Sequence, residues 1–566
     1  MTRRTVTVLI AGLALTVAAA PKLPRLFLTS DRCVACHNGI VTPSGEDVSI
    51  GTAWGTTMMA NSSRDPYWQA SIRRETLEHA PAGAEIENEC AACHMPMART
   101  DAVARGMIGR VFAHLPVYRL KTEADALAAD GVSCSMCHQV RADKLGTRAS
   151  FTAGFVVDTT TAAGKRREFG PFDTDEGRAG LMLSSTGFRP DKADHVRSSE
   201  LCATCHTLYT HALDDRSEVV GMLPEQVPYL EWRHSAYSDD RSCQSCHMPA
   251  VDGETPITGI VGRPRDGFAR HVFVGGNFLI QRLLGLYRAP LGVNAPSPDL
   301  EGAALRTVSH LEGEAAEISF GNAVVSNDVL LIDVSVANLA GHKLPTAYPS
   351  RRAWIHFTVR DGSGKVVFES GRLNADGSIE GNVNDADGSR FEPHHAEIRR
   401  AEDVQIYEGI LADPKEQVTT VLLAASHYVK DNRLLPAGFD KATAEPDIAP
   451  KGAAAGDADF TGGSDRVRYE VKTGGAAGPF EVLAELLYQP ISYRWAHNLE
   501  LRPSAEGDRF LSYYKAMPIR SAVLSRARTV VGQGRAGFSP RRHFPPSVPS
   551  VVRPGPAGAG EDRACD

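Results

Sequence analysis

The C-terminal half of the chain alternates apolar and polar residues with the two-residue period of a β-strand. Between residues 329 and 336, Ile332, Val334 and Val336 fall on one face and polar side chains fall on the other. Residues 353–359 repeat the alternation. Each segment therefore predicts a strand with one buried face.

Turn sequences separate these strands. The run Asp-Gly-Ser-Gly at 361–364 precedes an apolar stretch at 365–368, so strand 353–359 is expected to form a hairpin with it. Further strand candidates are residues 404–407, 418–423 and 482–487. The pattern predicts an antiparallel β-sandwich-like domain over residues 303–500.

The two ends of the chain have other patterns. Residues 1–20 place Arg3 and Arg4 before an apolar run that ends in small residues, which is typical of a secretory signal peptide. Helical propensity over 505–531 predicts a C-terminal helix. The composition of 532–566, rich in Pro, Gly and Arg, predicts a disordered tail.

Five copies of Cys-x-x-Cys-His lie between residues 33 and 247 and use ten of the 11 cysteines. They are Cys33/Cys36/His37, Cys90/Cys93/His94, Cys134/Cys137/His138, Cys202/Cys205/His206 and Cys243/Cys246/His247. In each copy the two thiols can form thioether bonds to one haem, and the histidine can bind its iron. The motifs therefore predict five covalently attached haem c groups.

Structural zinc is the main alternative for paired cysteines, but zinc sites do not require a histidine directly after every second cysteine. The motifs allot about 43 residues to each haem, so porphyrin should supply much of the interior. We therefore expect a mainly helical, loop-rich domain over residues 21–300, and an α+β multidomain fold for the whole chain.

The ligand on the second face of each iron separates an electron carrier from an enzyme, because an iron bound by two side chains has no position for a substrate. A lone histidine is usually solvated or hydrogen-bonded, but iron coordination is the main local demand for imidazole beside haems. Six histidines outside the motifs lie in this region: His79, His114, His195, His211, His234 and His271. We expect all of these except His211, which closely follows its own motif, to be iron ligands.

Two other sets of residues are alternatives as iron ligands. No histidine precedes the first motif, so Met58 or Met59 is an alternative ligand there, against simple packing. His342 lies in a Gly- and Pro-punctuated loop of the β-domain, which either caps an iron or is an ordinary sandwich loop. In the first case, Arg351 or Arg352 is expected to pair with a haem propionate.

Net charge and the predicted cellular compartment restrict the classes of molecule that the protein is expected to bind. The formal net charge is −7, which makes nucleic acid an unfavourable partner and leaves other redox proteins as donor and acceptor. No second apolar run of spanning length follows the signal sequence, so we expect a periplasmic or extracellular protein without a transmembrane segment after cleavage. The leftover Cys565 is expected to have no role, and the oligomeric state stays open.

Several segments resemble a known group, the bacterial multihaem c-type cytochromes related to the tetrahaem cytochromes of nitrifiers. The resemblance rests on Cys-His-Met-Pro at 93–96 and 246–249, and on the runs 199–209, 232–235 and 270–277. Segments 341–354 and 488–496 resemble a subset with an appended β-domain.

This resemblance implies an electron-transfer protein with haems in close pairs and two histidines on each iron. Our leading hypothesis is therefore an exported electron carrier that passes electrons between redox partners. The alternative is an oxidoreductase with one open haem that acts on a small nitrogen or sulfur compound. The chain has no Cys-x-x-Cys-Lys variant of the kind found in catalytic relatives, which weakens the alternative.

Overall fold

The computed structural model describes residues 25–162 and 164–532. The predicted signal peptide, Cys565 and all but the first residue of the predicted tail lie outside these residues. Within the described ranges, no helix combines the length and the apolarity needed to cross a bilayer.

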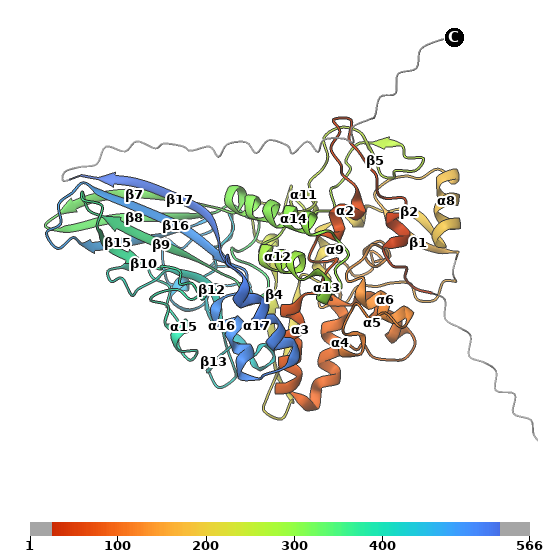
Figure 1. The fold of residues 1–566 in the computed structure, drawn as a ribbon, viewed down its shortest axis with the longest axis horizontal. Helices are drawn as coiled ribbons and strands as arrows, with labels where there is room; N and C mark the ends of the chain where they lie inside the picture. The colour runs from red at the N-terminus through yellow and green to blue at the C-terminus, as the bar shows by residue number, and fades with distance from the viewer. Residues whose placement is uncertain (1–24, 163, 533–566) are drawn as a thin grey trace, which may run out of the picture.

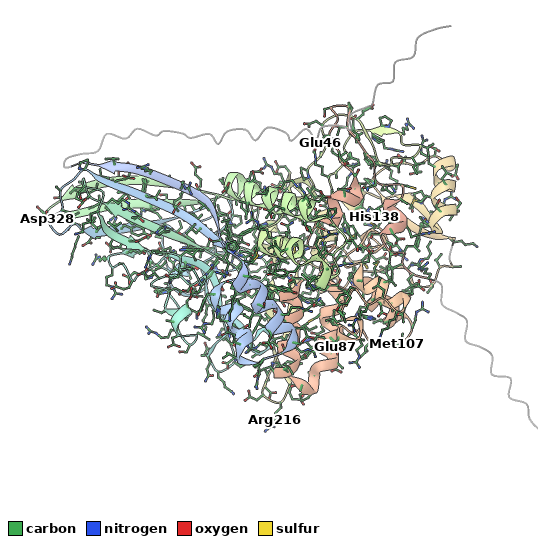
Figure 2. All side chains as sticks on the ribbon, viewed as in Figure 1. Glu46, Glu87, Met107, His138, Arg216 and Asp328 are labelled. Atoms are coloured by element: carbon green, nitrogen blue, oxygen red, sulfur yellow. The ribbon has the colours of Figure 1, made fainter. Side chains whose placement is uncertain are left out.

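The fold has two halves, and this confirms the α+β prediction (Figure 1). The helical half, residues 25–310, consists mainly of short helices and long connections, with three two-stranded sheets among them. The β half, residues 311–532, has its two larger sheets at the opposite end of the molecule. Figure 2 shows His138 among the helices and Asp328 at the far tip of the strands. The longer helices of the helical half are α3 (Pro66–Glu78), α4 (Gly83–His94), α5 (Pro96–Ala104), α8 (Glu176–Thr186), α12 (Phe278–Leu286) and α14 (Ser297–His310).

Two sheets form the β half. The seven-stranded sheet joins β9 (Arg352–Arg360), β10 (Val366–Ser370), β12 (Ile406–Ala412), β13 (Val418–Thr419), β14 (His427–Asp431), β16 (Phe480–Gln489) and β17 (Ala522–Val531). The four-stranded sheet joins β7 (Ala316–Ser326), β8 (Val329–Asn338), β11 (Glu397–Ile398) and β15 (Ser464–Lys472). Every pair in these sheets is antiparallel except β11 with β15.

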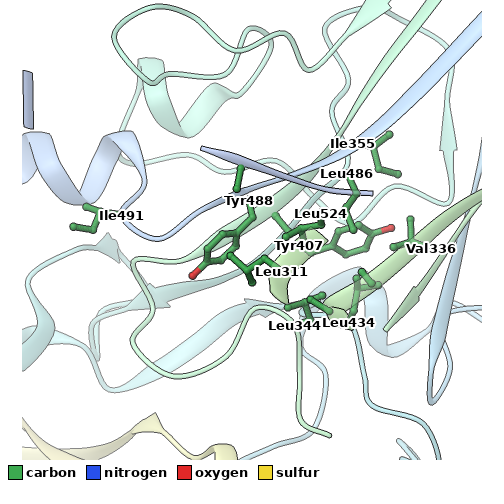
Figure 3. Packing of buried hydrophobic residues seen from close by; sticks show 14 of the residues in the cluster. Leu311, Val336, Leu344, Ile355, Tyr407, Leu434, Leu486, Tyr488, Ile491 and Leu524 are labelled. Atoms are coloured by element: carbon green, nitrogen blue, oxygen red, sulfur yellow. The ribbon is translucent and has the colours of Figure 1, made fainter. Parts of the chain in front are cut away.

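The two sheets pack face to face as a sandwich. The ring of Phe357 on β9 stacks on that of Tyr469 on β15, with centroids 3.8 Å apart. Both side chains are buried, and Leu486, Tyr407 and Val336 extend the same apolar cluster (Figure 3). Successive side chains of a strand point to opposite faces of its sheet. The apolar residues of the alternating pattern therefore all lie on the face that packs against the other sheet.

Most of the strand predictions are confirmed, and two are confirmed only in part. Segments 329–336, 353–359 and 482–487 lie in β8, β9 and β16, and the predicted hairpin forms between β9 and β10. Segment 404–407 only enters β12 at Ile406, and segment 418–423 is a strand for two residues before a short 3₁₀ turn.

The predicted C-terminal helix over 505–531 is wrong in its second part. Helix α17 spans Ala505–Ala516, and the chain then enters strand β17, which pairs along β16. Pro518 disfavours helix for the residue before it, and the β-branched residues Val523, Thr529, Val530 and Val531 favour a strand. The sheet therefore continues past residue 500, the predicted end of the β-domain.

Candidate functional site

Each of the five motifs lies on a turn of helix. The helices are α1 (Asp31–Val34), α4, α7 (Cys134–Cys137), α9 (Ser199–Ala203) and α11 (Cys243–His247). Where the helix ends before the motif's histidine, its N–H still bonds the carbonyl of the first cysteine, as in His37 to Cys33 at 3.0 Å. Residues three and four positions apart share a helix face, so each motif presents two thiols and one imidazole to the same side.

All five motifs face one continuous cavity of about 2060 Å³. All ten motif cysteines and all five motif histidines line it. Ordinary ligand pockets have about 300–1,000 Å³, so this cavity suits several large groups rather than one small ligand. Five motifs that are dispersed along the sequence therefore share one interior space.

The motif histidines are oriented for metal binding. In four of the five, Nδ1 lies against a backbone carbonyl oxygen: that of Ile257 for His37, Ser62 for His94, Phe169 for His138 and Val274 for His247. A carbonyl oxygen can only accept, so Nδ1 carries the proton and Nε2 keeps a free lone pair. Metal-binding histidines characteristically have this arrangement.

Burial keeps these imidazoles neutral. It lowers the pKa of all five motif histidines, and the pKa values of His94 and His247 fall to about 4. The indole of Trp68 also stacks on His94 with centroids 4.4 Å apart and planes 4° apart. At neutral pH the histidines are therefore in the form that donates an electron pair to a metal.

Thiol contacts show which motifs are neighbours. The Cys33 thiol lies close enough to that of Cys134 to interact with it, and the same holds for Cys93 with Cys205 and for Cys202 with Cys243. Cys137 also interacts electrostatically with Cys205. The fourth motif, Cys202/Cys205/His206, is thus adjacent to the second, third and fifth, and the first adjoins the third.

His342 of the β half lies opposite the fifth motif. Its ring is parallel to that of His247, with an angle of 9° and centroids 6.2 Å apart. With the rings parallel, this separation is compatible with one metal atom between the two Nε2 nitrogens at metal–nitrogen distances of about 2 Å each, if both nitrogens face it. The Nδ1 of His342 donates to the carbonyl of Lys343 at 2.9 Å, which leaves its Nε2 free.

The other expected iron ligands fall into two groups. His271 lines the cavity and interacts with both His138 and His37, and its Nδ1 donates to the Ala269 carbonyl at 3.0 Å. Four others do not line the cavity: His79, His114, His195 and His234.

Hydrogen bonds distinguish the members of this second group. The Nδ1 of His114 hydrogen-bonds with Asp125 at 2.8 Å, and the Nδ1 of His234 donates to the Leu230 carbonyl at 2.9 Å. The buried Nε2 of His79 has no hydrogen-bond partner among the described residues. In His195 the pattern is inverted, because Nε2 itself donates to the Val140 carbonyl at 2.8 Å.

Several cavity residues were not expected from the sequence or differ from expectation. His310, at the end of α14, lines the cavity and lies near His247, although it follows the last motif by 63 residues. His211 also lines it and contacts Glu89. Arg351 faces the cavity, whereas Arg352 is buried away from it against Asp385 and Gln489, so only Arg351 remains a propionate partner.

The residues present fit haem c. The motif thiols are free, and the cavity-lining Arg265 has a buried Nε without a partner in the described structure, as expected of a group that meets a carboxylate. A space of about 2060 Å³ is large enough for several large groups, and such groups would remove the side chains that line it from water.

Comparison with known proteins gives one structural match. No protein-family model and no curated protein sequence match the chain. Among solved structures, the chain is similar to the "Crystal structure of a penta-heme cytochrome c552 from Thermochromatium tepidum", with 15% sequence identity and a TM-score of 0.51. The match covers 90% of this chain and 100% of that chain. The match shows a shared fold; the relation to multihaem cytochromes, including the tetrahaem cytochromes of nitrifiers, stays a prediction.

Proposed function

We propose that the chain is an exported pentahaem c-type cytochrome that transfers electrons between redox partners. The observation that carries this proposal is the single cavity lined by all ten motif cysteines and all five motif histidines. Each haem, once attached, supplies an iron that gains and loses one electron. The fold of the pentahaem cytochrome from Thermochromatium tepidum supports the same conclusion.

The chain's own residues then have defined roles. The ten cysteines anchor the groups through thioether bonds, and the motif histidines hold one face of each iron through Nε2. Carbonyls such as those of Ile257 and Phe169 fix the ring orientation through Nδ1. If haems occupy all five sites, the thiol contacts would place the fourth site next to the second, third and fifth.

For the second iron face, we propose His342 opposite His247 and His271 opposite His138. The parallel rings of His342 and His247 support the first pair, and the location of His271 beside His138 in the cavity supports the second. His79, His114, His195 and His234 stay predictions. The inverted hydrogen bond of His195 makes it the least suited of these to bind iron through Nε2.

The alternative function, an oxidoreductase with one open haem, is best tested at the first motif, Cys33/Cys36/His37. The first motif has Met58 and Met59 in the cavity lining as local candidates for the second iron ligand, and His271 also interacts with His37. If none of these side chains binds it, the haem of His37 is the one that can accept a substrate.

Low-temperature electron paramagnetic resonance of the oxidised protein tests the electron-carrier proposal. We expect low-spin ferric signals that account for all five haems, because every iron then has two strong-field side-chain ligands. A high-spin signal equal to about one fifth of the iron would contradict the pure carrier and favour the open-haem oxidoreductase. A matched sample with a small ligand such as cyanide would then show whether that iron is accessible.

A further inference from the structure

The loop that carries His342 is fixed to both halves of the chain. On the β side, Leu344 and Leu434 exchange two backbone hydrogen bonds of 2.9 Å and pack side by side in the core (Figure 3). The Asn338 amide also donates to the His342 carbonyl at 2.8 Å. On the helical side, the Tyr237 hydroxyl donates to the Leu339 carbonyl at 3.1 Å.

A buried carboxylate of the helical half holds the residue next to His342. Glu231 lies on α10 (Pro228–Arg233), and its side chain is fully buried. Its Oε2 accepts from the backbone N–H of Lys343 at 3.2 Å and from the hydroxyl of Thr346. One side chain from the helical half thus bonds the loop at two points just after His342.

Three charged side chains of the β half complete the cluster. Arg433 Nη1 lies 3.0 Å from Glu231 Oε1, and Arg433 also binds both oxygens of Asp431 at 2.8 Å. Lys343 Nζ donates to Asp431 at 2.7 Å. The exposed fractions of these four residues are between 0% and 6%, and their formal charges cancel.

A buried cluster of charges is weak evidence for a role in stability alone. Buried ion pairs are often no more stabilising than apolar residues of the same size, because removing the charges from water is costly. They do require defined partners, and loss of one partner leaves an uncompensated buried charge. A cluster of two acids and two bases at a boundary between halves therefore favours one geometry of the loop over all others.

We infer that Glu231 is a positioning residue that locks the His342 loop across the fifth haem site. The β half thereby presents an iron ligand to the helical half, and Glu231 fixes where that ligand stands. This inference rests on the proposed function, since it requires a haem on Cys243, Cys246 and His247.

Four variants of the full-length, haem-loaded protein test the inference. Glu231→Ala removes both loop contacts, and Glu231→Gln keeps an acceptor oxygen for the loop but loses the charge. His342→Ala removes the ligand itself. Asp385→Asn is the matched control, because Asp385 forms a buried ion pair with Arg352 at 2.9 Å in the β half but contacts neither Glu231 nor His342.

The readout is the share of ferric iron in the high-spin state, measured by electron paramagnetic resonance with and without added imidazole. We expect His342→Ala to convert about one fifth of the iron, Glu231→Ala to convert most of the same fraction, and Glu231→Gln clearly less. Imidazole should restore the low-spin signal in both alanine variants. Asp385→Asn should match the unmodified protein.

The outcomes separate the positioning role from the ligand itself. If His342→Ala converts one haem but Glu231→Ala converts none, the positioning role is wrong while the His342 ligand stands. If His342→Ala converts none, the proposed ligand is wrong and the role of Glu231 is wrong with it. Equal conversion by Asp385→Asn would also overturn the inference, because any damage to the β half would then suffice.

Discussion

The two halves of the chain build their interiors from different material. In the β half, Phe357, Tyr469 and their neighbours fill the space between two sheets with side chains. In the helical half, a cavity of about 2060 Å³ that all the motif cysteines and histidines line lies beside smaller apolar clusters, one of which includes Ile86 and Met97. The packing of the β half therefore needs no bound group. We expect the packing of the helical half to depend on the groups that its cysteines bind.

The boundary between the halves is closely packed. Helices α12 and α14 belong to the helical half, yet Leu283 and Leu300 on them are part of the apolar cluster that includes β8 and β9. The His342 loop crosses in the other direction. We therefore expect the two halves to differ strongly in their free energy of local unfolding, although they share a packed interface.

The largest expected effect comes from preventing haem attachment. Replacing all ten motif cysteines with alanine should unfold most of residues 30–260, because the side chains that line the cavity would then have no bound group to pack against. The strands β8, β9, β15 and β16 should stay protected. Hydrogen exchange followed by mass spectrometry measures both regions in one sample, and equal protection of the two halves would break the comparison.

A single truncation in the β half gives the next largest effect. Phe357→Ala removes a fully buried ring that stacks on Tyr469, and we expect a loss of about 3–5 kcal/mol in the free energy of unfolding of that half. Denaturant titration followed by near-ultraviolet circular dichroism measures the loss. Below the transition, the haem absorption spectrum should not change. A loss under about 1 kcal/mol would show that this half does not depend on its side-chain core.

The smallest expected effect is a pH dependence confined to the β half. Burial lowers the pKa of His356, but hydrogen bonds with Glu485 at 3.2 Å and Glu369 at 3.0 Å outweigh it and leave the pKa above 6.5. The folded state then binds the proton more tightly than the unfolded state. The stability from this proton is complete below pH 6.5 and is lost as pH rises through the folded-state pKa.

His356→Gln tests this pH dependence. We expect the variant to be less stable than the unmodified protein by about 1 kcal/mol near pH 6 and by much less near pH 9. Denaturant midpoints at both pH values measure the difference. A difference that grows with pH would mean that His356 is neutral in the folded state.

Much of the fold could be predicted from the sequence, for physical reasons that also explain the failures. Long alternation in β8 and β16 identifies strands because each has one buried face. The helix ends before Pro518, and β17 is a strand because it pairs with β16. Local propensity does not depend on a pairing partner that is distant in the sequence, so it cannot predict this strand.

The site divides in the same way. The spacing of the five motifs identifies ten cysteines and five histidines, because covalent attachment fixes spacing along the chain. The second iron face depends on contacts between distant segments. His342 approaches His247 and Glu231 holds its loop only through the packing of the two halves, while His79 and His195, chosen for nearness along the sequence, do not line the cavity.

The haem content of the purified protein tests the central claim most directly. Intact-mass spectrometry, with a parallel absorption assay of haem against protein, should give five covalently bound haems per chain, and four when Cys202 and Cys205 are both replaced by alanine. A chain that carries zinc, or fewer than five haems when produced with haem-attachment machinery, would contradict the account.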